Sequence, residues 1–510
     1  MIPVPVLAAV HARTLAWQDY IAIALYFLFT LGIGWWCARR RQTAANDYFL
    51  GGGRVPWWAA AVSFFATATS GISFMALPAK SYFDKNWLAY GTVPSQTLAG
   101  FVVGFVFVAL LRRMSVATIF SYLDRRFDQR VRVLGAVLAI LLKVVGRMSV
   151  ILLLPALALS TVTGLNVYVS ILLMGVVTTI YAVEGGFEAV IWTDFLQAIV
   201  VFGGIIVSLV YLAGGVDGGL PGILKAGAAS GRFTMLDWSF NLADGTVWVF
   251  TGMFFATIFT YLGDQPLMQR MLAMSTDREA TGTVVTGCII GTVSATLFFF
   301  IGTSLSLFYE ANPGRLAEGL PNDAIFPFFI ANELPHGVVG LIIAALFAVS
   351  MGALSGIINS AAAIVVSDFQ MLLRPASTER QRVRVARLTT FLCGMFATVF
   401  AMWLAAQDAK SLWDVFIKLV ALVGGGFPGV FALGMLTRRA NAPGVIIGAV
   451  ASIVVTWWIQ NYTAANVFVH SFFAITSCMV IGYLASLFFS GATKTREELR
   501  GLILWEKLGR

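Results

Sequence analysis

Three carboxylates surround a glycine pair in an almost uncharged part of the chain. The stretch YAVEGGFEAVIWTDFLQ at 181–197 contains Glu184, Glu188 and Asp194. A carboxylate beside a long apolar run is unfavourable unless it lies at an interface, is paired with a cation, or binds a ligand. Glu184 and Glu188 lie near a helix start, where the helix dipole stabilises them, so we expect both at a surface in a structural role. Asp194 lies one to two turns deeper, as either an interface carboxylate or a functional group.

Two basic residues lie one helical turn apart in another apolar run, LLKVVGRMSVILLLPALALS. Lys143 and Arg147 are four residues apart and share a helix face. Lys143 is close enough to the end of the run for its amino group to snorkel to the surface. Arg147 is deeper, and a buried guanidinium can grip a carboxylate with two parallel hydrogen bonds. Arg147 therefore predicts an anionic, carboxylate-bearing solute. The alternative is that it forms a structural ion pair with Asp194, Asp264 or Asp414.

The elements that hold these residues are predicted to cross a membrane. The chain has 510 residues, of which 59% are hydrophobic and 12% are charged, and its mean hydropathy is +0.84. Soluble proteins carry about twice that share of charge. Four widely separated cysteines without a CxxC pair indicate neither a disulfide framework nor a zinc site. The N-terminal segment lacks a basic region before its apolar part, so we interpret it as a tail and not as a cleaved signal.

Thirteen apolar runs are long enough for a helix to cross the hydrocarbon, which takes about 20 residues. They cover roughly 18–38, 55–78, 86–111, 133–160, 164–183, 188–213, 246–266, 283–309, 336–366, 387–406, 412–436, 442–460 and 468–490. With the N-terminus outside and the C-terminus in the cytoplasm, most of the 34 Lys and Arg fall in cytoplasmic segments, as the positive-inside rule requires. We therefore expect a multi-pass protein of the plasma (inner) membrane. The net charge of +9 reflects this topology, and no nucleic acid is needed to explain it.

Two of the runs contain residues that interrupt helices. The run at 57–78 has small polar residues in its middle, including Thr67, and the run at 251–266 ends on Gly263, Asp264 and Pro266. The two runs lie five spans apart, in corresponding positions of two five-helix halves. Interrupted helices at matched positions indicate a binding site near the middle of the membrane in inverted-repeat transporters. The alternative is that small residues only allow close helix packing.

Several blocks of the chain resemble the sodium/solute symporter family. The most specific are YAVEGGFEAVIWTDFLQ and DYFLGGGRVPWW at 47–58; the supporting blocks, in family order, are SVATIFSYLDRRF (115–127), PALALSTVTGLN (155–166), QPLMQRMLA (265–273) and GVFALGML (429–436). The resemblance implies an all-α integral membrane protein with a five-plus-five inverted-repeat core. It divides the chain into a tail and accessory helix (1–44), two core halves (45–215 and 216–440), and two accessory helices with a cytoplasmic tail (441–510).

The same resemblance implies a main sodium site between the broken first core helix and the eighth. The backbone carbonyls that bind the ion map onto Ala66, Thr69 and Val349. The two hydroxyl ligands of the family map onto Gly352 and Ala353, which have no side-chain oxygen. Sodium is a hard cation that takes oxygen ligands, so this departure weakens the main site.

A second sodium site, found in some members of the family, maps onto Asp194 and Ser355, with Gly356 in place of a third oxygen ligand. The resemblance makes an ion-linked or gating role the favoured interpretation of Asp194.

For the solute, the candidate contacts are Arg147, Thr67, Asp264, Gln265 and Lys418. Lys418 lies on the tenth core helix, which lines the sugar site in the family, and Asp264 replaces a usual asparagine. No organic cofactor and no metal other than sodium is predicted.

The sequence therefore predicts a sodium-coupled symporter of a small organic solute, possibly a carboxylate, that works by alternating access. One alternative keeps the fold but couples to protons, or to nothing, with Asp194 and Asp264 as proton carriers. Another alternative is a membrane sensor, although only about 20 residues follow the last run, too few for a signalling domain. An enzyme is not expected, because the sequence has no HExxH or GxSxG motif. The oligomeric state is not predicted.

Overall fold

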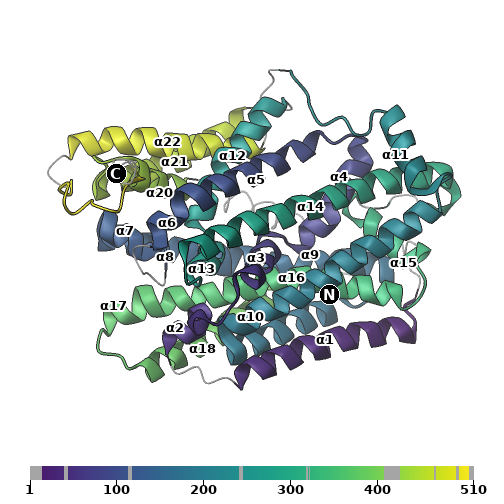
Figure 1. The fold of residues 1–510 in the computed structure, drawn as a ribbon, viewed down its shortest axis with the longest axis horizontal. Coiled ribbons are helices and arrows are strands. Elements are labelled where there is room, and N and C mark those ends of the chain that lie inside the picture. The colour runs from purple at the N-terminus through teal and green to yellow at the C-terminus, as the bar shows by residue number, and fades with distance from the viewer. Residues whose placement is uncertain are drawn as a thin grey trace.

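The computed structural model describes residues 14–39, 44–112, 118–239, 245–317, 320, 322–406, 426–463, 467–489 and 493–504. Most of its long helices run roughly along one direction (Figure 1). The helices of the first part are α1 (Trp17–Ala38), α2 (Ala45–Leu50), α3 (Trp57–Ala68), α4 (Gly71–Asp84), α5 (Thr92–Val102), α6 (Val108–Arg112), α7 (Phe120–Arg126), α8 (Gln129–Ile140), α9 (Met148–Thr163) and α10 (Val167–Gly214). The second part contains α11 (Gly219–Ala229), α12 (Thr246–Gly263), α13 (Gln265–Leu272), α14 (Asp277–Ala311), α15 (Ile325–Glu333), α16 (Val338–Ile364), α17 (Met371–Leu373), α18 (Glu379–Ala406), α20 (Phe427–Leu436), α21 (Ala442–Tyr462) and α22 (Val467–Phe488).

The described residues contain ten helices that are long and apolar enough to cross a membrane, or eleven when α3 and α4 are counted as one bent span. The helix α10 has 48 residues and covers two predicted runs, 164–183 and 188–213. The predicted run at 412–436 lies mostly outside the described residues, which resume at α20. The multi-span, all-helical architecture is thus confirmed.

A kink at the glycine pair divides α10 into two helical parts. Gly186 has φ 56° and ψ −148°, a conformation that side chains rarely adopt. A Cβ on Gly186 would also lie only 2.9 Å from the carbonyl oxygen of Tyr48. The glycines of the 181–197 stretch therefore turn the chain from one span into the next and let the Tyr48 backbone approach.

The carboxylates around this kink lie in different surroundings. Glu184 is exposed, as predicted, but Glu188 is buried, and its Oε2 atom lies 3.4 Å from Nε of Arg54. The prediction that Glu188 lies at the surface is therefore wrong, because the DYFLGGGR segment folds over it and supplies a cation. Its structural role stays a prediction.

The helix α16 lies in the interior of the structure and is buried along almost its whole length (Figure 1). It contacts α1, α3, α4, α9, α10 and α18. At its start, the buried Asp19 of α1 accepts hydrogen bonds from the backbone N–H groups of Gly337 and Gly340, at 2.6 and 3.0 Å. These bonds fix α1 to the beginning of α16.

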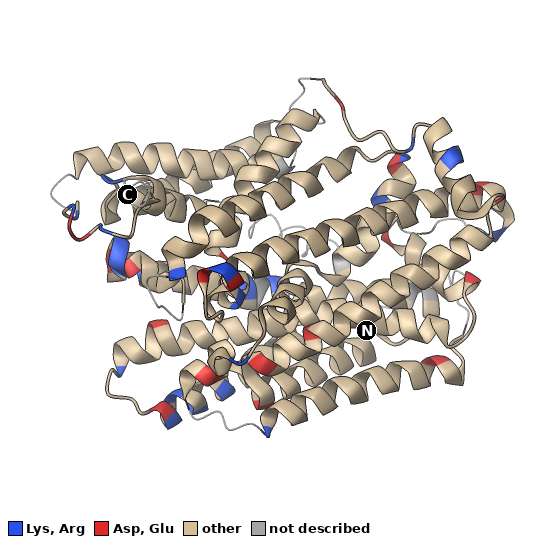
Figure 2. Cartoon of the chain, in the orientation of Figure 1, with Lys and Arg blue, Asp and Glu red and all other residues tan. Residues whose placement is uncertain are grey.

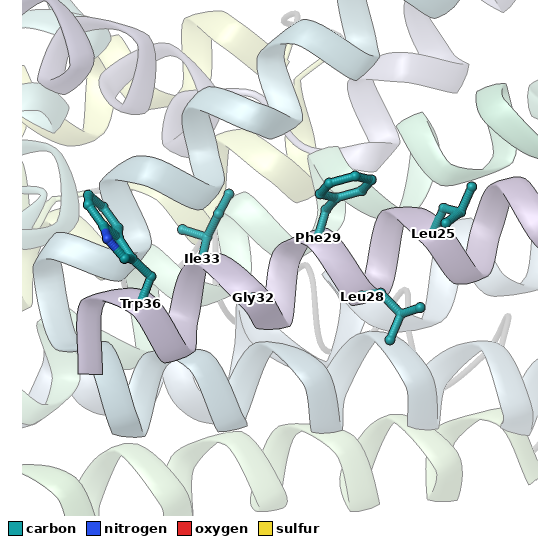
Figure 3. A pocket seen from close by; sticks show the side chains of 6 residues that line it. All are labelled: Leu25, Leu28, Phe29, Gly32, Ile33 and Trp36. Atoms are coloured by element: carbon teal, nitrogen blue, oxygen red, sulfur yellow. The ribbon is translucent and has the colours of Figure 1, made fainter. Parts of the chain in front are cut away.

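The outside of the structure is apolar, as lipid contact requires. An example is a hollow on the outer face of α1, lined by Leu25, Leu28, Phe29, Gly32, Ile33 and Trp36. Figure 3 shows Phe29, Ile33 and Trp36 on one side of the helix and Leu28 on another. Because its lining is almost entirely apolar, we assign this hollow to lipid.

Charged residues gather toward the ends of the long helices, and the spans between are nearly uncharged (Figure 2). The exception is a group of acidic and basic residues near α13, in the middle of the view. The buried charged residues of the described part of the chain include Asp194, Asp264 and Arg270, which belong to the site described next.

Candidate ion and solute site

The site is built around the break between α3 and α4. Thr69 and Ser70 are extended, with φ/ψ of −91°/142° and −125°/163°, and the two helices meet at an angle of 61°. A helix that ends leaves its last four carbonyl groups without partners in the same helix. The carbonyl groups predicted to bind an ion, those of Ala66 and Thr69, lie in this last turn and at its cap.

Across the break, α16 presents Val349, Gly352 and Ala353 in its buried face. Gly352 and Ala353 supply no side-chain oxygen. The hydroxyl group of Ser355 donates to the carbonyl oxygen of Gly352 at 3.0 Å, and that of Ser350 donates to Leu346 at 3.0 Å. Both serines are fully buried, and their oxygens keep lone pairs for a cation.

Asp194 forms a buried ion pair that the sequence analysis did not anticipate. Its Oδ2 atom lies 3.3 Å from Nη2 of Arg270 and accepts a 2.5 Å hydrogen bond from Ser63. Arg270 also donates to Ser63 at 3.0 Å and to the carbonyl oxygen of Pro266 at 2.7 Å. Both charged side chains are completely buried. A signal for Arg270 is present in QPLMQRMLA, where an arginine closely follows a helix break.

Arg147, Asp264 and Thr67 meet at a cavity of about 350 Å³. Its lining also includes Ala68, Gln96, Met253, Ala256, Thr257, Thr260, Tyr261, Pro266, Leu267, Ile357 and Ser471. A second cavity, which shares Ala68, Gln96 and Tyr261 with the first, is lined by Thr69 and Ser73 on the other side of the break. The break between α3 and α4 therefore lies against both cavities.

The charges at the first cavity do not balance. Nζ of Lys143 lies 2.7 Å from Oδ2 of Asp264, and Nη1 of Arg147 lies 3.9 Å from the same oxygen. The prediction that Lys143 snorkels to the surface is wrong, because Asp264 attracts its amino group inward. Two cations and one carboxylate give a net charge of +1, and the Arg147 side chain is 45% exposed while Lys143 is 15% exposed.

The other predicted solute contacts fall elsewhere. Oε1 of Gln265 accepts a hydrogen bond from the backbone of Ile119 at 2.9 Å, and the residue is fully buried away from the cavity lining. Lys418 lies outside the described residues. Of the five predicted contacts, the structure brings together Thr67, Arg147 and Asp264.

The comparisons with known proteins agree with this architecture. The model of the sodium:solute symporter family matches residues 48–452. The chain belongs to that family. It is a membrane transporter and not an enzyme, and sodium-coupled movement of a solute is the activity for which the family is named.

Relatives match this family member over nearly its whole length. It is 32% identical to the sodium/sialic acid symporter NanT of Aliivibrio fischeri over 96% of both chains. It is 33% identical to the sodium/sialic acid symporter SiaT of Proteus mirabilis over 93% of this chain and 96% of that protein. The sodium/glucose cotransporter of Vibrio parahaemolyticus is 29% identical over 86% of this chain and 84% of its own length.

Solved structures agree with the fold. A substrate-bound, outward-open Na⁺-coupled sialic acid symporter superposes with a TM-score of 0.86 at 32% identity, over 93% of this chain and 98% of that one. Mhp1, a nucleobase-cation-symport-1 family transporter, superposes with a TM-score of 0.54 at 13% identity, over 91% and 98% of the two chains. The second likeness bears on the fold alone.

Proposed function

We propose that this symporter moves a small carboxylated solute of the sialic acid type across the plasma membrane together with sodium. The observation that carries the proposal is the net charge of +1 around the cavity beside the helix break. Lys143 neutralises Asp264 from 2.7 Å, which leaves the guanidinium of Arg147 for an incoming anion. Arginine binds carboxylates through two parallel hydrogen bonds.

The rest of the lining suits a polyhydroxylated solute. Thr67, Gln96 and Thr260 offer hydroxyl and amide groups, and Tyr261 offers an aromatic face. Binding sites for small molecules combine mostly apolar walls with a few placed polar groups. The two relatives named for sialic acid, a carboxylated sugar, support the same class of solute.

For the mechanism we infer alternating access between two core halves, residues 45–215 and 216–440, flanked by segments 1–44 and 441–510. Each half contains one interrupted helix: α3/α4 breaks at Thr69 and Ser70, and α12/α13 breaks at Asp264. Solute and ion would bind at these breaks, and rocking of one half would expose them to the other side. We place the N-terminus outside and the C-terminus in the cytoplasm from the positions of Lys and Arg.

The proposal is tested by comparing two ligands that differ at one group, a charged carboxylate in one and an uncharged methyl ester in the other. Binding of sialic acid and of its methyl ester to the purified full-length protein would be measured by calorimetry in NaCl. Removing a charged partner from a hydrogen-bonded pair costs about 1.5–3 kcal/mol, so the acid should bind about 10- to 100-fold more tightly than the ester. Arg147→Gln should abolish this difference. Equal binding of acid and ester by the wild-type protein would refute the proposed role of Arg147.

A second candidate keeps the fold and the solute but couples transport to protons or to no ion. It is favoured by one observation, the absence of side-chain oxygens at Gly352 and Ala353. Asp194 and Asp264 would then carry the proton. Coupling to protons predicts uptake that depends steeply on external pH in sodium-free buffer, whereas sodium coupling predicts no accumulation there.

A further inference from the structure

An apolar groove lies between α10 and α18, and it shares no lining residue with the two cavities beside the helix break. Its volume is about 180 Å³. The residues that line it are Val176, Thr179, Ile180, Val183, Glu184, Phe391 and Met395. Ile180 is 46% exposed and Phe391 is 48% exposed, so the groove opens on the outer face of the protein. In a membrane this face contacts lipid, and the groove is open to a lipid chain.

Two close contacts at glycines set the distance between α10 and α18. A Cβ on Gly394 of α18 would lie 2.0 Å from Oγ1 of Thr179, and a Cβ on Gly175 of α10 would lie 2.0 Å from Oγ1 of Thr398. Only glycine allows this approach, as is common where helices pack inside a membrane. Small residues thus form the seam between the two helices, and the larger side chains beside the seam form the walls of the groove.

Tyr48 of α2 joins the two helices at one end of the groove. Its hydroxyl group forms a hydrogen bond with Thr390 of α18 at 3.0 Å and donates to the carbonyl oxygen of Ala182 of α10 at 3.1 Å. Together with the glycine contacts, these bonds show that the two helical segments run antiparallel. Glu184 and Arg387 both lie close enough to this hydroxyl group to act on it electrostatically. The groove therefore ends at charged residues.

Three arginines continue the groove along α18. With about 3.6 residues per turn, positions 380, 384, 387, 391 and 395 share one side of the helix. The last two belong to the groove, and the first three are Arg380, Arg384 and Arg387. Arg380 and Arg384 are exposed, and Arg387 is half-buried. Basic residues are visible at this end of α18 in Figure 2. The apolar walls thus lead to three cations and one carboxylate.

These three arginines lack partners in the part of the chain that the structure describes. Nε of Arg387 is buried and has no hydrogen-bond partner among those residues. Arg382, on another side of α18, pairs with Glu379 at 2.5 Å, whereas Arg380 and Arg384 form no ion pair with a described residue. A buried donor without an acceptor is unfavourable, so the surroundings of Arg387 need an explanation.

A row of cations at the beginning of a helix is unfavourable by itself. Like charges three or four residues apart on a helix repel each other, and the N-terminal end of a helix already has a partial positive charge. A bound anion would relieve both effects. A phosphate group accepts hydrogen bonds from guanidinium groups, and an acyl chain attached to that phosphate would cover the groove.

We propose that this groove and the adjoining arginines form a binding site for an anionic phospholipid. One acyl chain lies along Ile180, Phe391 and Met395, and the phosphate group lies between Arg384 and Arg387. A free phosphate would use the arginines alone, so the open apolar groove favours a lipid. In the orientation proposed above, this end of α18 faces the cytoplasm, where anionic lipids are concentrated. The site depends neither on the solute nor on the coupling ion.

The test is lipid binding to the purified full-length protein, measured by native mass spectrometry. The probes are dioleoylphosphatidylglycerol, dioleoylphosphatidylcholine, which has the same chains but no net charge, and sn-glycerol 3-phosphate, which has no chains. Each basic residue near a membrane surface strengthens binding of anionic lipid about fivefold. Three arginines against one carboxylate leave two net charges, so the anionic lipid should bind about 25-fold more tightly than the zwitterionic one. The glycerol phosphate should bind more weakly than either lipid.

Variants of exposed charges test the proposed headgroup contacts. Arg384→Gln should weaken binding of phosphatidylglycerol about fivefold, and the double variant Arg380→Gln, Arg384→Gln about 25-fold. Both side chains are exposed, so these variants should melt at the same temperature as wild type. Arg130→Gln is the matched control, because Arg130 is also the exposed second residue of a helix, α8, and its loss should leave lipid binding unchanged. Glu184→Gln removes a like charge and should strengthen binding.

A change in the groove tests the proposed chain contact separately. Met395→Trp fills part of the groove without changing its charge. It should weaken binding of both phospholipids by the same factor and keep the preference for the anionic one.

Three results would overturn the proposal. The first is equal binding of the two phospholipids by the wild-type protein. The second is unchanged binding in the double arginine variant, or an equal loss in Arg130→Gln, which would make general surface charge responsible. The third is binding of sn-glycerol 3-phosphate as tight as that of the lipid, which would exclude the groove. None of these results affects the comparison of acid and ester, which tests the proposed solute.

Discussion

The buried pair of Arg270 and Asp194 allows a prediction whose size follows from the contacts. Arg270→Met removes the guanidinium and leaves Asp194 buried with a single donor, Ser63, at 2.5 Å. Removing one partner of a buried ion pair typically destabilises a protein by about 3–5 kcal/mol. Because Ser63 still donates to the carboxylate, we expect a loss near the lower value, about 3 kcal/mol.

The reciprocal change completes a double-mutant cycle. Asp194→Asn should also destabilise the protein, since it leaves Arg270 buried among neutral acceptors. The double variant contains no buried charge at this place and should be less destabilised than the sum of the single variants by about 2–3 kcal/mol. Denaturation in mixed detergent micelles, followed by tryptophan fluorescence, measures all four proteins.

The stability of the same variants can also be compared with and without sodium. In Arg270→Met a cation can take the place of the guanidinium beside Asp194, so sodium should stabilise this variant more than wild type. A ligand at 100 times its dissociation constant contributes about 2.7 kcal/mol. Additive single variants, or a cost below about 1 kcal/mol for Arg270→Met, would contradict a tightly coupled pair.

Three other predictions address neighbouring parts of the structure. Gly186→Ala forces a side chain into a left-handed conformation against the Tyr48 carbonyl group and should lower the unfolding free energy by about 1–3 kcal/mol in the same denaturation assay. Lys143→Met removes one cation from the cavity and leaves its net charge at zero, so calorimetry should show weaker binding of a carboxylated solute with little change for a neutral ester. Asp19→Ala removes the acceptor for two backbone N–H groups at the start of α16 and should cost about 1–3 kcal/mol, measured by thermal unfolding.

The sequence predicted the local features of the site well, because each depends on a few adjacent residues. The break at Thr69 and Ser70 follows from small polar residues within an apolar run, and the glycine pair before Phe187 marks the kink in α10. Arg147 is recognisable because an arginine inside a membrane span is rare. The family resemblance predicts an ion site at the same break and predicts that a side-chain ligand is missing at Gly352.

What sequence reasoning missed depends on contacts between helices far apart along the chain. Arg270 reaches Asp194 across 76 residues, and only the fold of α13 against α3 and α10 brings them together. The inward position of Lys143 likewise depends on Asp264, which lies at the break between α12 and α13.

The measurement that tests the central claim most directly is uptake of labelled sialic acid into proteoliposomes under an imposed sodium gradient, with internal and external pH equal. We expect accumulation above equilibrium in sodium, none in choline, and loss of accumulation in Arg147→Gln. Accumulation driven by a pH gradient in sodium-free buffer, or undiminished uptake by Arg147→Gln, would contradict the account.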